Sequence, residues 1–140
     1  MIMLQKLSVF FLALCCPALS FAGLLVVVAE SSPLAEMDRH EVRQLYMDNA
    51  SRVDGHAVTV LDMPEGSQQR ERFYQGATGK SASQLKSYWA RMIFTGQGMP
   101  PRQVKNARDM VQQVKQNPRA VGYVQEADMQ EGLRVLLRLP

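Results

Sequence analysis

Apolar and polar positions follow two different periodicities along the chain, and each periodicity predicts a different kind of element. The unbroken apolar run Leu24–Ala29 is short and rich in valine, which is typical of a strand buried on both faces. Similar short runs at Ala57–Leu61, Ala120–Val124 and Leu133–Leu139 predict three further strands. The segments between these runs place an apolar residue at every third or fourth position, which predicts helices.

Four helices are expected, and three of them begin at a residue that can cap them. Asp38 with Glu41, and Ser81 with Gln84, have the spacing of a capping box, and Asn106 is expected to cap the last helix. The apolar stripes expected to face the core are Val42, Leu45 and Tyr46 in the first helix, Leu85, Tyr88, Trp89, Met92 and Ile93 in the third, and Met110, Val111 and Val114 in the fourth.

The second helix is expected to be short, because glycines follow it closely. It begins after the turn Pro64–Ser67, runs through Phe73 and is expected to fail near Gly76 and Gly79. The segment Gly98–Arg102 contains two prolines and is expected to be a stiff loop. Strands that alternate with helices predict an α/β domain with a central mixed sheet of about four to five strands flanked by helices.

The first 22 residues differ from the remainder of the chain. Lys6 precedes the apolar run Leu7–Leu14, and the small residues Ser20 and Ala22 suit a signal peptidase. This pattern predicts a signal peptide cleaved after Ala22 and export to the periplasm. A retained membrane anchor is the alternative, but the run is shorter than the roughly 20 apolar residues that a spanning helix needs.

Both cysteines of the chain, Cys15 and Cys16, lie in this first segment. Acylation of either one would make a lipoprotein, but Leu14 stands where a small residue is wanted. Residues 23–140 contain no cysteine, so their stability has to come from a hydrophobic core rather than a disulfide. A chain of this length is sufficient for one core and one domain.

Charge is distributed unevenly along residues 23–140. The range Gly23–Gln69 holds three Lys and Arg against eight Asp and Glu, whereas Arg70–Lys115 holds nine against two. The basic range has two interpretations. Its charges can be solvated faces of helices, or they can form a positive face that attracts an anion or an acidic surface.

Residues 23–140 show no pattern of a catalytic or metal centre. His40 and His56 have no Cys or carboxylate at metal-ligand spacing. No Ser-His-Asp order, pair of catalytic carboxylates or phosphate-loop glycine pattern is present. The basic range lacks the interleaved aromatic residues expected of a nucleic-acid-binding surface. We therefore expect a binding module rather than an enzyme, with no cofactor, no metal and no nucleic-acid partner.

The most specific motif is W-x-x-x-I-F-T-G-x-G-x-P-P at Trp89–Pro101, followed downstream by NPRAVGYV. Upstream lie LLVVVA, LYMDNA and VTVLDMPEGSQQRERF. On these segments the chain from Gly23 to Pro140 resembles small single-lobe relatives of the phosphate ABC transporter substrate-binding proteins, in the type 2 periplasmic-binding-protein superfamily. The resemblance implies one lobe of a fold that normally has two, with the ligand between them.

The resemblance also implies where a ligand binds. In that family a turn rich in Ser, Gly and Thr opens a helix and holds phosphate, because the first backbone amides of a helix lack internal partners and carry partial positive charge. Gln68 and Gln69 replace the second Gly and the Thr of that pattern, and Asp62 and Glu65 would repel a phosphate. The expected ligand-binding residues are Gly66, Ser67, Gln68, Gln69 and Arg70.

Two functions remain open at this point. One is a solute-binding module for phosphate or another small oxyanion, connected with ABC-type transport through a membrane transporter. The other is a periplasmic protein-interaction module derived from a binding-protein lobe, with no small-molecule ligand. In the second case Ser67 is only the N-cap of its helix, a common role for serine.

Overall fold

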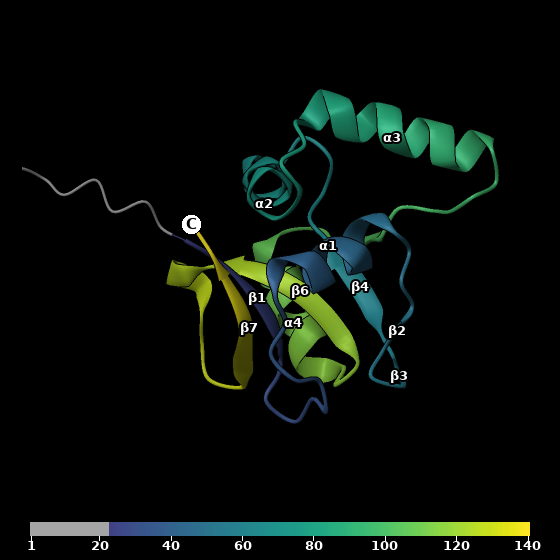
Figure 1. Ribbon diagram of the computed structural model, residues 1–140. Coiled ribbons are helices and arrows are strands. Elements are labelled where there is room, and N and C mark those ends of the chain that lie inside the picture. The colour runs from purple at the N-terminus through teal and green to yellow at the C-terminus, as the bar shows by residue number, and fades with distance from the viewer. Residues whose placement is uncertain (1–22) are drawn as a thin grey trace, which may run out of the picture.

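The computed structural model describes residues 23–140. The expected signal peptide, its cleavage after Ala22, and Cys15 and Cys16 lie outside the described residues. A five-stranded sheet with strand order β5-β4-β6-β1-β7 forms the centre, and a separate hairpin pairs β2 with β3 (Figure 1). The elements are β1 (Leu24–Ala29), α1 (Arg39–Met47), β2 (Arg52–Val53), β3 (His56–Ala57), β4 (Thr59–Asp62), α2 (Gln68–Thr78), α3 (Ala82–Phe94), β5 (Arg102–Gln103), α4 (Ala107–Gln116), β6 (Ala120–Gln125), a short 3-10 helix (Glu126–Asp128) and β7 (Leu133–Leu139).

The sheet is mixed, as the sequence predicted. Strand β4 runs parallel to β5 and to β6, whereas β1 runs antiparallel to β6 and to β7. Helices α2 and α3 connect β4 to β5, and α4 connects β5 to β6. The carboxyl ends of β4, β5 and β6 therefore share one edge of the sheet, which is where ligands bind in open α/β sheets.

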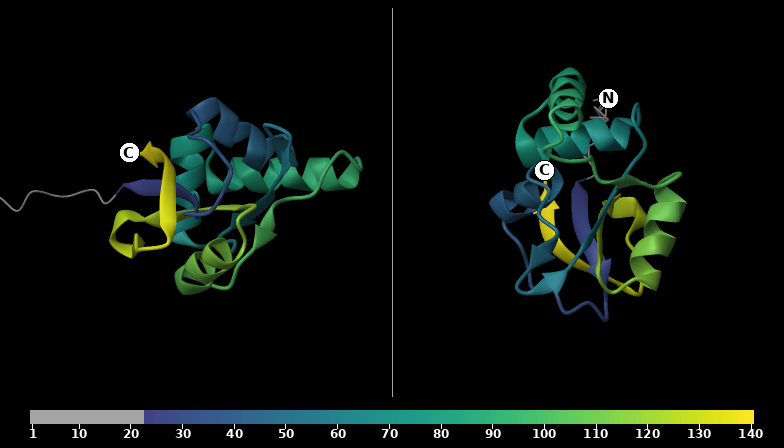
Figure 2. Two further views of the ribbon diagram at one scale, coloured as in Figure 1. Left: turned by 90° about the horizontal axis from the view of Figure 1, so that it is seen from below. Right: turned by 90° about the vertical axis from the view of Figure 1, so that its right-hand side faces the viewer.

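Helices cover both faces of the sheet, and β6 shows which helix covers which face. Successive side chains of a strand point to opposite faces. At Gly122 an added Cβ would lie 2.5 Å from Sδ of Met110 in α4, whereas the ring of Tyr123 stacks on Phe73 of α2 with 3.8 Å between centroids. Figure 2 shows the same layers, with α4 opposite α1 and α2, and α3 farther out beyond α2.

Most of the expected elements are confirmed. All six residues of Leu24–Ala29 are buried in β1, and the turn that opens α1 is the capping box expected of Asp38 and Glu41. The capping box of α3 and the Asn106 cap of α4 are also present. The helix residues that are buried in the core as expected are Val42, Leu45, Tyr46, Met110, Val111 and Val114.

The strand expected over Ala57–Leu61 is wrong in its bounds. Ala57 pairs with Arg52 in the hairpin, while Thr59 pairs with Ala120 of β6, so the chain changes partner at Val58. The segment expected to be only a stiff loop also contributes the short strand β5 at Arg102. In both places the pairing partner decides the boundary, and no local pattern encodes that partner.

Two expectations about the helices are confirmed only in part. Helix α2 ends at Gly79 as expected, where φ is 72°, but it continues through Gly76; burial of Phe73, Tyr74 and Ala77 outweighs the roughly 1 kcal/mol cost of glycine in a helix. In α3 only Leu85 and Trp89 of the expected stripe are buried. Ile93 is 49% exposed, because α3 extends past the edge of the sheet (Figure 1).

Within residues 23–140, none of the helices has the length and apolar character needed to cross a bilayer.

The close approach of α4 to β6 at Gly122 generates a stability prediction. Gly122→Ala places a Cβ 2.5 Å from Sδ of Met110 and 2.9 Å from Cγ2 of Val114, so we expect a loss of about 1–3 kcal/mol in the free energy of unfolding. Gly76→Ala is the control, since its Cβ meets nothing closer than 3.7 Å and alanine suits a helix better than glycine by about 0.5–1 kcal/mol. Denaturant unfolding measures both, and equal effects would contradict the packing described.

Candidate functional site

The expected binding turn lies between the end of β4 and the start of α2. Gly66 adopts a φ of +86°, a conformation that glycine takes without strain. Ser67 is the N-cap of α2: its Oγ accepts a hydrogen bond from the backbone N–H of Arg70 at 3.4 Å, and its own N–H donates to the carbonyl of Pro64 at 3.0 Å. The capping role foreseen for Ser67 is therefore present in the structure.

Two backbone amides at the start of α2 remain unpaired. Among residues 23–140 the N–H groups of Gln68 and Gln69 have no hydrogen-bond acceptor, whereas the N–H of Glu71 donates to the carbonyl of Ser67. The side chain of Gln68 is exposed. That of Gln69 is buried, and its Nε2 has no partner in the described part of the chain. The helix start therefore offers two donors at its positive end.

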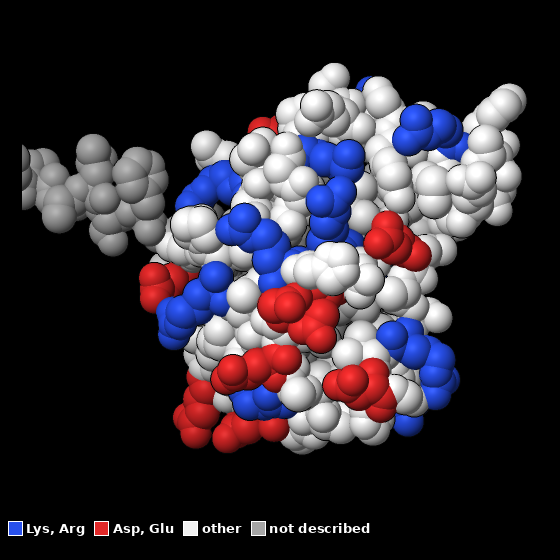
Figure 3. All heavy atoms as spheres, viewed as in Figure 1, with Lys and Arg blue, Asp and Glu red and all other residues white. Residues whose placement is uncertain are grey.

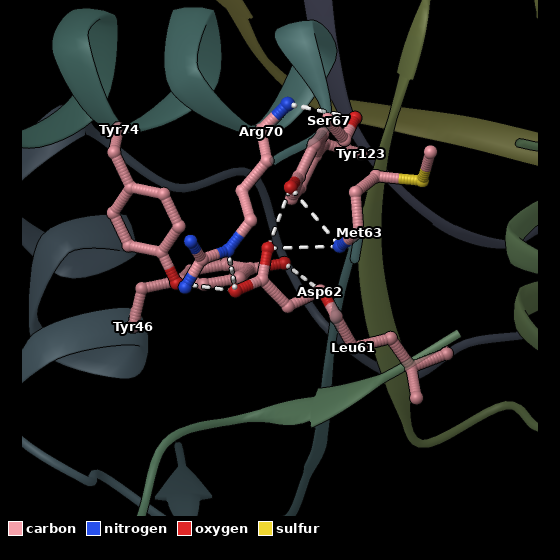
Figure 4. Close-up of polar contacts among 8 residues, drawn as sticks. All are labelled: Tyr46, Leu61, Asp62, Met63, Ser67, Arg70, Tyr74 and Tyr123. Carbon is pink, nitrogen blue, oxygen red and sulfur yellow. Dashed lines mark hydrogen bonds and ion pairs between the residues drawn. The ribbon is translucent and has the colours of Figure 1, made fainter. Parts of the chain in front are cut away.

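Arg70 belongs to a buried network around the carboxylate of Asp62 (Figure 4). Oδ2 of Asp62 accepts from Nε of Arg70 at 3.1 Å and from the hydroxyl of Tyr74 at 2.7 Å. Oδ1 accepts from the hydroxyl of Tyr123 at 2.6 Å and from the backbone N–H of Met63 at 2.8 Å. Asp62 is 1% exposed, so its charge is compensated inside the protein by Arg70.

The tyrosine hydroxyls of this network stay protonated. Burial raises the pKa of Tyr74 and of Tyr123, and the negative charge of Asp62 raises both further. Burial alone would lower the pKa of Arg70, but the Coulombic attraction of Asp62 and their hydrogen bond outweigh it and raise the pKa. Arg70 therefore remains a cation, and both tyrosines remain donors to Asp62.

The neighbouring Tyr46 extends the same cluster without touching Asp62. Its hydroxyl donates to the carbonyl of Leu61 at 2.7 Å, and burial raises its pKa well above the ordinary value, with the charge of Asp62 adding to the shift. The network thus joins α1, the end of β4, the start of α2 and β6. Its effect is to hold the first turn of α2 at the carboxyl edge of the sheet.

A cavity of about 510 Å³ opens beside this turn. It lies between the start of α2, one side of α3 and the chain that leads into β5. Of the five expected site residues, Gly66 and Arg70 line it. The other wall comes from α3 and includes Lys86 and Trp89. Trp89 is 5% exposed, and its indole N–H has no acceptor among residues 23–140.

Lys86 and Trp89 were missed as site residues by the sequence analysis, which assigned Trp89 to the core. Trp89 is indeed buried, but it also lines the cavity. The two residues are three positions apart on α3, so they share a helix face, and that spacing was a readable signal. Nothing in it showed that this face meets the start of α2.

The other candidates lie apart from this cavity. His40 is exposed and its Nε2 lies 3.2 Å from Nε2 of Gln44, and His56 is exposed in the β2–β3 hairpin. In the described residues no three His, Cys, Asp or Glu side chains gather as they would around a metal ion. On the face drawn in Figure 3, Asp and Glu lie mostly in the lower half, while Lys and Arg extend over the upper half, where Figure 1 places α2 and α3.

The fold is similar to that of several solved binding proteins. An ABC-type phosphate transport receptor from Vibrio cholerae superposes with a TM-score of 0.63 at 17% identity, over 81% of this chain and 45% of the receptor. A phosphate ABC transporter substrate-binding protein from Clostridium perfringens, solved with bound phosphate, gives 0.64 at 12% identity, over 81% and 44%. PstS from Borrelia burgdorferi gives 0.58 at 10% identity, over 81% and 46%.

These comparisons confirm the expected fold, which is similar to a single lobe of these binding proteins. The chain spans about half the length of the solved proteins that it matches. Those neighbours are transport binding proteins rather than enzymes. No family model matches the sequence, and no curated protein matches it either.

The buried ion pair predicts a large effect of Asp62→Ala. The substitution leaves Arg70 without its partner and two tyrosine hydroxyls without their acceptor, so we expect a loss of about 3–5 kcal/mol in the free energy of unfolding. The control is Glu126→Ala, which breaks the exposed ion pair with Arg138 and should cost only about 0–1 kcal/mol. Denaturant unfolding compares the two, and a similar cost for both would contradict the role given to Asp62.

The raised tyrosine pKa values predict a loss of stability in alkali. In the unfolded chain a tyrosine ionises at about pH 10, whereas Tyr46, Tyr74 and Tyr123 stay protonated in the folded protein. Above that pH the unfolded state binds fewer protons than the folded state. The free energy of unfolding therefore keeps its full value below that pH and decreases above it, by up to about 1.4 kcal/mol per pH unit for each tyrosine. The free energy of unfolding, measured as a function of pH above this value, should decrease less steeply for Tyr74→Phe. An unchanged slope would refute the raised pKa of Tyr74.

Proposed function

We propose that residues 23–140 form an exported binding module that takes a small oxyanion, such as phosphate, at the start of α2, in connection with ABC-type transport. The observation that carries this proposal is the pair of unpaired backbone amides at Gln68 and Gln69. They lie at the positive end of an eleven-residue helix, where oxyanions bind in many unrelated proteins.

The surroundings of these amides support anion binding. Gly66 leaves open space, because a Cβ added there would meet no atom within 4 Å, so a ligand can approach the backbone closely. Arg70 and Lys86 place positive charge on the cavity wall, which also carries the carboxylates Glu65 and Glu71. The Asp62 network holds the first turn in place before any ligand arrives, and a preorganised site avoids an ordering cost on binding.

The comparisons support the same ligand class through the fold. The Vibrio cholerae neighbour is described as a phosphate transport receptor, and the Clostridium perfringens neighbour contains phosphate. This chain corresponds to less than half of either protein. One lobe by itself covers only one side of a ligand, so we expect the affinity of residues 23–140 for inorganic phosphate to be modest.

Export to the periplasm is part of the proposal and rests on the signal-peptide pattern, with cleavage after Ala22. The fold supports it, because the solved neighbours are binding proteins of transport systems. In that compartment a membrane transporter is the partner that would receive the bound ion.

A protein-interaction module is the second candidate, and the end of α3 favours it. Phe94 is 93% exposed, Met99 64% and Ile93 49%. Neighbouring exposed apolar side chains of this size mark protein contacts more often than single ones do. On this alternative the open face binds another periplasmic protein and no small molecule.

Gln68→Pro tests the oxyanion site directly. Gln68 is the first residue of α2, a position that tolerates proline because its N–H has no partner within the helix. Ser67 has φ −67° and ψ 129°, a conformation that the residue before a proline accepts. The substitution thus deletes one proposed donor and keeps the helix. Isothermal titration with inorganic phosphate should show about tenfold weaker binding.

Gln68→Ala is the matched control, since it removes the side chain and retains the backbone N–H. It should bind phosphate like the unchanged protein, and both variants should keep the same melting temperature. Phosphate binding that is equal in the two variants would exclude the helix start as the site. An absence of binding to phosphate and sulfate in the unchanged protein would favour the protein-interaction alternative.

A further inference from the structure

The cavity beside α2 is larger than an inorganic oxyanion requires. Its volume of about 510 Å³ lies in the range of roughly 300–1,000 Å³ that is typical of pockets for organic ligands. Gln68 and Gln69 do not line the cavity, but Gly66 and Arg70 on either side of them do, so a phosphate ion bound to the amides of Gln68 and Gln69 would lie at one end of the cavity. The remainder extends along α3 toward the segment that precedes β5.

Most of the wall of the cavity is apolar. Ala82, Trp89, Ala90 and Ile93 line it from α3, and Pro100 closes it from the loop. These side chains do not favour binding of a phosphate ion, because its oxygens would lose their hydration there without gaining hydrogen bonds. They would gain free energy by covering an apolar group.

Trp89 adds an aromatic ring to this apolar wall. Its indole N–H is buried and has no acceptor among residues 23–140, whereas buried donors in proteins are generally paired. Trp89 lines the cavity, but its indole nitrogen is closed to it, so the side chain offers a bound ligand an apolar aromatic surface.

Charge in the cavity does not favour a bare anion strongly. The lining includes the cations Arg70 and Lys86, but also the carboxylates Glu65 and Glu71. Arg70 is already paired with Asp62. The lining therefore carries no excess of positive charge, and affinity for an anion has to be supplemented by contacts with an uncharged part of the ligand.

We propose that the ligand of this site is an organic oxyanion: its anionic group binds the amides at the start of α2, and its apolar substituent lies against Trp89 and Ile93. The inference rests on the oxyanion site proposed above and extends it to a ligand class. Phosphomonoesters of aromatic or branched aliphatic alcohols belong to this class, and inorganic phosphate contributes only their anionic end.

Phenyl phosphate is the probe for this inference. Inorganic phosphate and phenol are the comparison ligands, and they represent its anionic part and its apolar part. Covering much of one face of the ring should make phenyl phosphate bind at least about tenfold more tightly than inorganic phosphate, and phenol alone should bind far more weakly than phenyl phosphate. Titration calorimetry gives the three affinities. Trp89 is the only tryptophan of the chain, so its fluorescence should also change with phenyl phosphate.

Ile93→Ser and Phe94→Ser form a matched pair of variants. Both side chains are exposed, at 49% and 93%, so neither substitution threatens folding. Only Ile93 lines the cavity. Ile93→Ser should weaken phenyl phosphate binding by about threefold to tenfold, as expected from the apolar area lost, and leave inorganic phosphate unchanged. Phe94→Ser should alter neither.

The outcomes separate this inference from the function on which it rests. If inorganic phosphate binds, is weakened by Gln68→Pro, and binds as tightly as phenyl phosphate, the organic ligand class is wrong and the oxyanion site stands. If neither phosphate nor phenyl phosphate binds, the oxyanion site fails and this inference fails with it. If phenol binds as tightly as phenyl phosphate, the anionic contact at α2 is refuted.

Discussion

The buried carboxylate of Asp62 is the constraint on which the site depends. A carboxylate that is 1% exposed is stable only when it is paired and fully hydrogen-bonded, and here Arg70, Tyr74 and Tyr123 complete its shell together with one backbone amide. The partners come from α2 and β6, so satisfying one charge orients the first turn of a helix against the end of a strand. The first amides of that turn have no partner within the helix, and the network holds them at the edge of the sheet.

The same arrangement explains how a charge that should repel anions is compatible with an anion site. Asp62 directs its charge into the protein, where Arg70 compensates it, and the helix start beyond it presents the unpaired N–H groups of Gln68 and Gln69. Because its charge is paired with Asp62, Arg70 contributes less positive charge to the cavity. This is why the proposed ligand draws on the apolar wall of α3 as well as on charge, and why Trp89, which lines the cavity, is included in the proposed site.

Much of the fold could be predicted, and the failures have a common cause. The six-residue buried strand β1 and the capping boxes of α1 and α3 are encoded within a few neighbouring residues, so local patterns were sufficient. The bounds of β4, the short strand β5 and the exposure of Ile93 depend on which distant segment lies alongside. In the site, the turn at Gly66 was predictable from its helix-opening pattern, whereas Lys86 and Trp89 were not, because α3 approaches that turn only in the folded chain.

By itself the sequence determined the α/β class, the order of the main elements and the position of the helix that opens at Ser67, because periodicity, capping and turn preferences act over a few residues. Tertiary structure alone decided that Asp62 is buried against Arg70 and that a cavity forms between α2 and α3. Side chains far apart in sequence create those features, Asp62 and Tyr123 being 61 positions apart. Their energies depend on burial and mutual distance, which exist only after the chain has folded.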